Sequence, residues 1–154
     1  MLKCNKIYNH PLYKERTAKI AESEKDRIFC PHNLLHALDV ARIGYIEILE
    51  RGLNIDKELF YAASLLHDAG RYGDKPHNES GAELARIIMP DCGFSDVETE
   101  LVQNAILGHT AGTKSDVFSK ILYDADKRSR LCFLCKAQEE CYWTKEKRNY
   151  EISI

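Results

Sequence analysis

The segment LLHDAGR places His67 and Asp68 side by side at the end of an apolar run, directly before a glycine. Neighbouring residues of a helix point about 100° apart, so both side chains can approach one metal ion only near a helix end. A single pair of this kind is more often a solvated helix terminus, but the chain supplies partners for it. The residues that together predict one metal site assembled from several helices are His36, His67, Asp68, His77, His109 and Asp126.

The chemistry of these six side chains indicates which metals they suit. Imidazole and carboxylate form a mixed nitrogen and oxygen donor set, which suits Fe, Mn, Zn or Ni. His36, for example, lies in HALDVAR, on a segment whose apolar residues recur at helical spacing. One such histidine could simply fill space in a core. Four histidines and two aspartates in this pattern favour metal binding.

Helical periodicity extends along most of the chain, and no segment of useful length alternates like a strand. Pro31 is expected in a first helical turn, and Pro90 at the end of a later helix. Ser95 with Glu98 predicts a capping box. The predicted fold is all-α, a single-domain helical bundle with the metal site between helices. The expected helices span residues 12–25, 32–51, 56–69, 78–89, 95–109 and 115–131.

Length and charge exclude several functions. The 154 residues suffice for one domain with a proper core. A formal net charge of -2 gives no basic field, which argues against duplex nucleic acid as a partner. No apolar stretch approaches the ~20 residues of a membrane span. The polar start MLKCNKIYNH does not read as a signal peptide. We therefore expect a cytoplasmic protein without a membrane partner, and the sequence leaves its oligomeric state open.

Three motifs of the chain, HALDVAR, LLHDAGR and DADK, resemble the H...HD...D signature of the HD-domain metal-dependent phosphohydrolases. The resemblance covers residues 32–130, the expected domain core, and treats residues 1–154 as a single HD domain with 131–154 as an extension packed on it. Asp124 and Asp126 point roughly 200° apart on a helix, so both cannot face one ion. The family pattern places the ligand after the alanine, which favours Asp126. The metal ligands that the resemblance implies are His36, His67, Asp68 and Asp126.

The segments PHNESGAELA and AILGHTAG resemble more narrowly the branch that hydrolyses diadenosine tetraphosphate symmetrically. This likeness implies a two-metal centre, with iron the first expectation and Mn, Zn or Ni as alternatives. His77 and His109 would bind the second metal, and Asp68 would bridge the pair. That branch usually follows its final aspartate with a Glu-Pro element, which is absent from KRSRLC in this chain. The nucleotide pocket is therefore expected to differ.

The expected activity is hydrolysis of a phosphate ester or phosphoanhydride of a nucleotide, with a dinucleoside polyphosphate first, by a metal-bound hydroxide. Two ions about 3.5–4 Å apart can share a hydroxide and hold phosphate oxygens during displacement. Arg71 follows the His-Asp pair closely and offers a planar fork for phosphate, so with Asp68 it is a catalytic candidate. Lys127 and Arg128 are instead expected to be surface cations at a helix end. The substrate-binding candidates are Arg71, Lys75, Thr110 and Arg130.

Cysteines form a second informative pattern at the C-terminus. Cys132, Cys135 and Cys141 follow C-x2-C-x5-C spacing, and Cys30 precedes the His36 segment. Such clustering in a cytosolic chain indicates metal or redox chemistry more often than disulfides. The four cysteines also resemble the cluster ligands of iron–sulfur exonucleases, which implies a zinc or iron–sulfur centre. Free thiols on a terminal helix are the alternative, and His32 is a rival fourth ligand.

The sequence is also compatible with two other functions. A di-iron centre with the same histidine and aspartate ligands can activate O₂, so an oxygenase of the HD type is one alternative. A non-enzymatic nucleotide or redox sensor, in which the cysteines report to the metal helix, is the other. Cys4 and Cys92 have no partner at ligand spacing and are expected to be ordinary residues.

Overall fold

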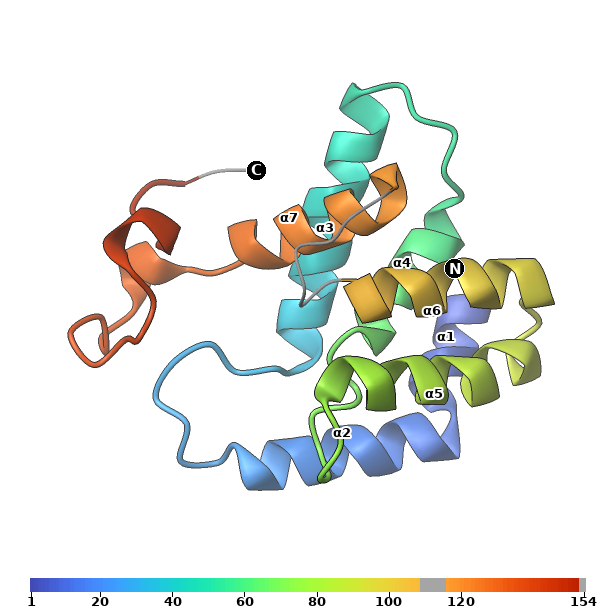
Figure 1. Ribbon diagram of the computed structural model, residues 1–154, viewed down its shortest axis with the longest axis horizontal. Helices are drawn as coiled ribbons and strands as arrows, with labels where there is room; N and C mark the ends of the chain where they lie inside the picture. The colour runs from blue at the N-terminus through green and yellow to red at the C-terminus, as the bar shows by residue number, and fades with distance from the viewer. Residues whose placement is uncertain (109–115, 153–154) are drawn as a thin grey trace.

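The computed structural model describes residues 1–108 and 116–152, and these residues are helical, with no strand. The expected all-α bundle of one domain is confirmed (Figure 1). No helix in the described ranges combines the length and the apolar character needed to cross a bilayer. The helices are α1 (Leu2–Asn9), α2 (Pro11–Ser23), α3 (Leu34–Glu50), α4 (Lys57–Leu66), α5 (His77–Asp91), α6 (Asp96–Gly108) and α7 (Val117–Arg128), and two 3-10 turns follow, η1 (Cys132–Leu134) and η2 (Lys145–Lys147).

Helix α4 lies in the interior and contacts α1, α3, α5, α6 and α7. Seven of its ten residues are buried, including Phe60 and the run from Ala62 to Leu66. A helix that is apolar on nearly all sides is stable only when surrounded by others. Its C-terminal end therefore delivers the next two residues, His67 and Asp68, to the inside of the molecule.

The remaining helices pack in two groups around α4. Helix α3 packs against α4 and α7, whereas α5 runs beside α6 (Figure 1). The apolar core is continuous through both groups. This arrangement brings the first turns of α3, the end of α4 and the last turns of α7 to one place.

Short polar side chains define where the helices begin. Asn33 accepts a hydrogen bond from the backbone N–H of His36 at 3.1 Å, and Asp56 accepts one from Leu59 at 2.9 Å. Such caps satisfy amide groups that have no partner within the helix. The predicted capping box is confirmed, because Glu98 accepts from the Ser95 backbone at 2.7 Å and Ser95 Oγ accepts from Glu98 N at 3.3 Å.

Several predicted boundaries were wrong. Pro31 precedes the cap of α3 instead of lying in its first turn, and Pro90 lies inside the last turn of α5. Helix α1 was not predicted at all, because its eight residues bury only Cys4 and Ile7, too few to show a period. The last helix ends at Arg128, so it does not continue toward the cysteines.

The chain after α7 is irregular and folds back on that helix. Asn149 Nδ2 donates to the carbonyl oxygens of Lys127 at 2.9 Å, Arg128 at 3.2 Å and Arg130 at 2.9 Å. The last carbonyls of a helix need partners outside it. The C-terminal segment supplies them and is thereby attached to the end of the helix that carries Asp126.

Candidate metal centre

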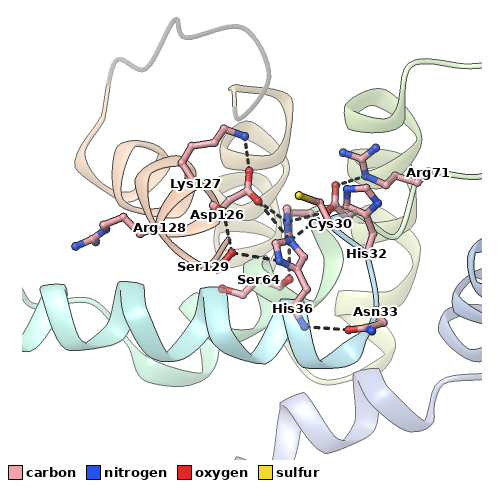
Figure 2. A network of polar contacts seen from close by, with 12 residues as sticks. Cys30, His32, Asn33, His36, Ser64, Arg71, Asp126, Lys127, Arg128 and Ser129 are labelled. Atoms are coloured by element: carbon pink, nitrogen blue, oxygen red, sulfur yellow. Dashed lines mark hydrogen bonds and ion pairs between the residues drawn. The ribbon is translucent and has the colours of Figure 1, made fainter. Parts of the chain in front are cut away.

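Four of the predicted ligands meet where α3, the end of α4 and α7 come together, and Figure 2 labels His36 and Asp126 among them. His36 Nε2 lies 3.4 Å from Asp68 Oδ2 and 3.3 Å from Asp126 Oδ1. His67 Nε2 lies 3.1 Å from Asp68 Oδ2 and 3.9 Å from Asp126 Oδ1. The donor atoms of His36, His67 and Asp68 all lie within 4.8 Å of one another. The structure thus gathers two imidazole nitrogens and two carboxylates around one point.

The end of α4 explains how adjacent residues can serve one site. The helix ends at Leu66, and His67 follows as the capping residue. Asp68 lies in the turn beyond it, where Ala69 N donates to Leu66 O at 3.1 Å. Because the chain leaves the helix here, the two side chains escape the angular divergence of helical neighbours. The structure therefore places the two side chains together, and their binding of one metal ion stays a prediction.

Hydrogen bonds at the far side of each ring settle which nitrogen faces the centre. His67 Nδ1 lies 2.7 Å from the carbonyl oxygen of Ser64, which can only accept, so Nδ1 carries the proton. Ser129 Oγ donates to the Asp126 carbonyl at 2.8 Å and lies 3.2 Å from His36 Nδ1, so His36 Nδ1 donates to Ser129. When the rings are neutral, as metal binding requires, this hydrogen bonding turns the Nε2 lone pair of each ring inward.

The site is buried and strongly charged. Burial would raise the pKa of Asp68, but His67, His36 and Arg71 hold that pKa well below its usual range. Burial would likewise raise the pKa of Asp126, and His36, His67 and Lys127 lower it instead. Both aspartates are therefore carboxylates, and they produce a negative potential inside the protein.

The histidines respond to that potential. Burial alone would lower the pKa of His36, but hydrogen bonds to Asp126 and Asp68 raise it to about 9. The pKa of His67 is also raised, because Asp68 and Asp126 outweigh the burial of its ring. The centre thus attracts positive charge, and its nitrogen and oxygen donors suit a divalent ion of the Fe, Mn, Zn or Ni type. We conclude that these four residues fit a metal ion.

His77 is the first residue of α5 and lies near this centre. Burial lowers the pKa of His77, Arg71 lowers it further, and Asp68 opposes the change. Its approach depends on Gly70, since a Cβ there would lie 2.2 Å from His77 O and 2.3 Å from Gly81 N. The turn after Asp68 is therefore pressed against the start of α5. His77 does not belong to the group of donor atoms within 4.8 Å. His109 and Thr110 lie outside the described residues.

The predicted cations divide into two kinds. Arg71 Nε donates to Asp68 Oδ1 at 2.7 Å. Arg71 and Arg130 both line a cavity beside the ligands. Lys75 pairs with Glu83 at 2.7 Å on the exposed surface, so the structure does not bring it to the site. Lys127, expected on the surface, contacts Asp126 Oδ2, whereas Arg128 pairs with Glu47 away from the ligands.

A cavity of about 640 Å³ opens beside the four ligands. His36, Asp126 and Arg71 line it, and the C-terminal segment supplies aromatic and basic side chains to its wall. Its volume lies within the range of small-molecule sites in proteins. The loop before α3 and the C-terminal segment both line this cavity. Their residues there include Phe29, Cys30, Arg130, Cys132, Cys135, Cys141, Tyr142 and Trp143.

Two further residues lie beside the ligands: Ser129, which was not identified as functional from the sequence, and His32, which was considered as a rival fourth ligand of the cysteines. Ser129 has no motif of its own, and only the folded chain places it against His36. His32 lies one turn before His36 in HNLLH, which was a usable signal, and its Nδ1 lies 2.6 Å from Glu24 Oε1. Burial lowers the pKa of His32 to about 4. The ring of His32 stands edge-on to that of His36, with centroids 5.9 Å apart.

The four cysteines face the same cavity, but they do not form a closed ligand set. All are free thiols of intermediate exposure. Among the described residues, only His36, His67 and Asp68 form a group of three or more donor atoms within 4.8 Å. The expectation that the four sulfurs already converge on one ion is therefore not met by this structure. Cys4 and Cys92 are buried in the core, as expected of ordinary residues.

The helical bundle and the His, His-Asp, Asp donor set from three elements define a metal-binding domain of the HD class. The chain belongs to the HD-domain family, whose model matches residues 33–131. The match begins at the cap of α3 and ends just after α7, so it contains all four ligands.

Similar proteins support this assignment. The chain is 40% identical to an uncharacterized protein of Clostridium beijerinckii over 96% of each chain. It is 33% identical over 82 residues to a bifunctional uridylyltransferase/uridylyl-removing enzyme of Rhodopseudomonas palustris, covering 44% of this chain but 9% of that enzyme. A predicted HD superfamily hydrolase from an uncultured Thermotogales bacterium has the same fold, with a TM-score of 0.62 and 28% identity over 88% of this chain and 80% of the other.

Proposed function

We propose that the protein is a metal-dependent phosphohydrolase that cleaves a phosphate ester or phosphoanhydride of a nucleotide. The observation that carries the proposal is the cavity, because one wall joins the metal ligands to basic and aromatic side chains. A substrate lying in it could place a phosphate at the ligands and a planar ring near Trp143. The relatives described as uridylyl-removing enzymes act by name on a nucleotidyl group, which agrees with this class of substrate.

His36, His67, Asp68 and Asp126 would hold the metal. A divalent ion at this position supplies Lewis acidity and lowers the pKa of a coordinated water. Hydrogen bonds to Ser129 Oγ and to the Ser64 carbonyl orient the two histidines. The histidines, Arg71 and Lys127 keep the two carboxyl groups ionised. We extend the proposal to a second ion, for which His77 lies nearby and His109 rests on the sequence alone, and we expect iron in both positions.

Arg71 is proposed to bind the phosphate during the reaction. Its Nε is held by Asp68 Oδ1 at 2.7 Å, which positions the guanidinium at the edge of the ligand set. Asp68 thus faces the histidines with Oδ2 and Arg71 with Oδ1. A guanidinium in a partly buried site stabilises the charge that develops on transferring phosphoryl oxygens. Lys127, which contacts Asp126, adds a second positive charge beside the cavity.

The proposed preference for a nucleotide rests on the aromatic and basic side chains that line the cavity. The Arg130 guanidinium stacks on Trp143, 4.1 Å from the ring centroid. Phe29 and Tyr142 also line the cavity and form an aromatic pair, with centroids 5.8 Å apart. Aromatic and arginine planes of this kind favour flat heterocycles carrying negative charge. Within this class a dinucleoside polyphosphate remains our first candidate, because it has phosphates for the cations and bases for the aromatic wall.

The test is hydrolysis by the full chain against a panel of dinucleoside polyphosphates, nucleoside mono- and triphosphates, uridylyl esters and p-nitrophenyl phosphate, with Fe²⁺, Mn²⁺, Co²⁺ or Zn²⁺ added. Asp126→Asn should abolish turnover and lower bound metal. Asp124→Asn is the matched control, since Asp124 lies two residues away on the same helix, is half-buried and is not part of the cavity wall. It should retain both properties.

Three outcomes would contradict the proposal. Cleavage of simple esters with no nucleotide cleaved would remove the nucleotide preference. Activity that requires O₂ and redox-active iron, and that Mn²⁺ does not support, would indicate an oxygenase. Nucleotide binding without turnover under any metal would indicate a sensor.

A further inference from the structure

The four cysteines that line the active-site cavity come from two distant segments that touch each other. Cys30 lies in the loop before α3, and Cys132, Cys135 and Cys141 lie in the segment after α7. Phe29 and Tyr142, the chain neighbours of Cys30 and Cys141, stack edge-to-face with centroids 5.8 Å apart. This contact brings the two thiol-bearing segments together across the cavity.

The C-terminal cysteines are held on one hydrogen-bonded frame. Cys135 N donates to Cys132 O at 3.1 Å and closes the turn η1, so the C-x2-C pair lies on one tight turn. Gln138 Nε2 also donates to Cys132 O, at 2.6 Å. Arg148 donates to Gln138 O and to Cys141 O, both at 2.9 Å. A tight C-x2-C turn with a further cysteine nearby is the arrangement found in structural thiolate centres.

This frame has almost no apolar core of its own. Of the described residues from 131 to 152, only Ala137 is buried. Leu131, Leu134 and Tyr142 expose 55%, 67% and 68% of their surface. An irregular segment that buries so little apolar surface is ordinarily stabilised by a crosslink such as a disulfide or a metal. The cysteines here are free thiols, and thiolates that line one cavity can supply such a crosslink by binding a metal.

The loop that carries Cys30 has an unusual backbone conformation at that residue. Cys30 has a φ of 46°, and it is the non-glycine residue with positive φ in the described ranges. Such a conformation is costly for a side chain and is kept where the surroundings impose it. Arg27 Nε imposes it here by donating to Cys30 O at 3.0 Å.

Two arginines near Cys30 partly oppose the rise that burial gives the pKa of its thiol. Burial raises the pKa of Cys30, Cys132 and Cys141 raise it further, and Arg130 and Arg27 oppose the rise. Four thiolates around a zinc ion leave a net charge of about -2. The cavity wall carries cations that can balance it, namely Arg27, Arg130, Lys136 and Arg148.

We propose that Cys30, Cys132, Cys135 and Cys141 bind one thiophilic metal centre, a zinc ion or an iron–sulfur cluster, that fastens the C-terminal segment over the active-site cavity. The sulfurs are not yet at ligand spacing, so binding must draw the η1 turn and the Cys30 loop closer together. The near absence of packing in the segment lets this happen at little cost. The centre is structural, and it holds Arg130 and Trp143 in the wall of the cavity.

The experiment measures zinc, iron and acid-labile sulfide per chain in full-length protein purified with and without exclusion of air. We expect one thiolate centre per chain in addition to metal at the His/Asp site. Cys132→Ser, Cys135→Ser and Cys141→Ser should each lose it, and Cys92→Ala, a buried cysteine away from the cavity, should keep it. Absorption distinguishes the two occupants, since a zinc site is colourless and an iron–sulfur cluster is coloured.

A second measurement uses Co²⁺ as the probe. Protein stripped by a chelator should develop thiolate-to-cobalt charge-transfer absorption when Co²⁺ is added, and Cys30→Ser should weaken it. His67→Ala should leave that absorption intact while the His/Asp site loses metal. Failure of this proposal is thereby distinguished from failure of the proposed hydrolytic function. Chelation should also speed cleavage by trypsin after Lys136 and Lys145, which are exposed but lie in the segment that the metal would hold.

The proposal is overturned if the cysteine variants keep the full metal content of the wild type, or if all four cavity thiols react freely in native protein before and after metal addition. It is also overturned if Co²⁺ produces no thiolate absorption in folded protein.

Discussion

The hydroxyl of Ser129 lies 3.2 Å from Nδ1 of His36 and donates to the carbonyl oxygen of Asp126 at 2.8 Å. One buried serine thus orients a histidine ligand from α3 and caps the helix that carries an aspartate ligand. Hydrogen-bond partners that orient a metal ligand typically change metal affinity by about 10–100-fold.

We therefore predict that Ser129→Ala lowers affinity for the first metal ion by about 10–100-fold while the fold persists. The reason is that His36 loses the acceptor that keeps its Nε2 lone pair turned inward. Competition with a chelator measures the change. Ser119→Ala is the control, because Ser119 is also buried on α7 but bonds Asp116 instead of a ligand. Equal metal affinity in the two variants would contradict the role of Ser129.

Arg71→Ala should lower kcat/KM by a factor equivalent to about 2–4 kcal/mol, with metal content close to that of the wild type. The guanidinium adjoins the ligand set through Asp68 without being a ligand itself. Steady-state kinetics and elemental analysis together test this. Lys75→Ala provides the comparison, since Lys75 pairs with Glu83 on the surface and should be removable without effect. Wild-type kinetics in Arg71→Ala would show that another group binds the phosphate.

His77→Ala and His109→Ala should each reduce bound metal by about one ion per chain if the centre is dinuclear. The remaining ion stays with His36, His67, Asp68 and Asp126, so the variants should stay folded by circular dichroism. Elemental analysis after removal of loosely bound metal gives the count. Unchanged stoichiometry in both variants would reduce the model to a single ion.

Trp143→Ala should raise KM for nucleotide substrates while leaving hydrolysis of p-nitrophenyl phosphate nearly unchanged. Loss of one stacking surface typically costs about 1–3 kcal/mol of binding. The comparison of two substrates separates recognition of the base from the chemistry at the ligands. A parallel loss on both substrates would mean that Trp143 supports the cavity without contacting a base.

Gly70→Ala should destabilise the protein by about 1–3 kcal/mol, as overpacking in a core does. An added Cβ would meet backbone atoms of His77 and Gly81 that cannot rotate away. Denaturant unfolding measures the loss. Gly108→Ala is the control, because no atom of the described residues lies within 4 Å of a Cβ there. A Gly70→Ala variant as stable as the wild type would show that the turn can move away from α5.

Much of the centre could be read from local sequence. His67 and Asp68 follow an apolar run in the sequence. Most side chains of that run are apolar and are buried in the helix it forms. His36 and Asp126 were identified from their motifs and lie with this pair in the structure. Helical periodicity and capping residues likewise predicted the bundle, since both depend on neighbours a few positions apart.

The positions of the cations required the folded chain. Lys75 and Lys127 look alike as lysines close in sequence to ligand candidates, yet one pairs with Glu83 on the surface and the other contacts Asp126. Side-chain direction at such sites depends on partners far away in the chain. The same holds for His32 and Glu24, and for the contact between Ser129 and His36.

Residue type and short-range spacing were enough to predict the all-α class, to nominate the four candidate ligands and to group the C-terminal cysteines. The folded chain was needed to show that α3, the end of α4 and α7 meet at one point and that the segment after α7 returns to face the Cys30 loop across the cavity. Those outcomes depend on contacts between residues tens of positions apart, and a linear pattern carries no record of such distances.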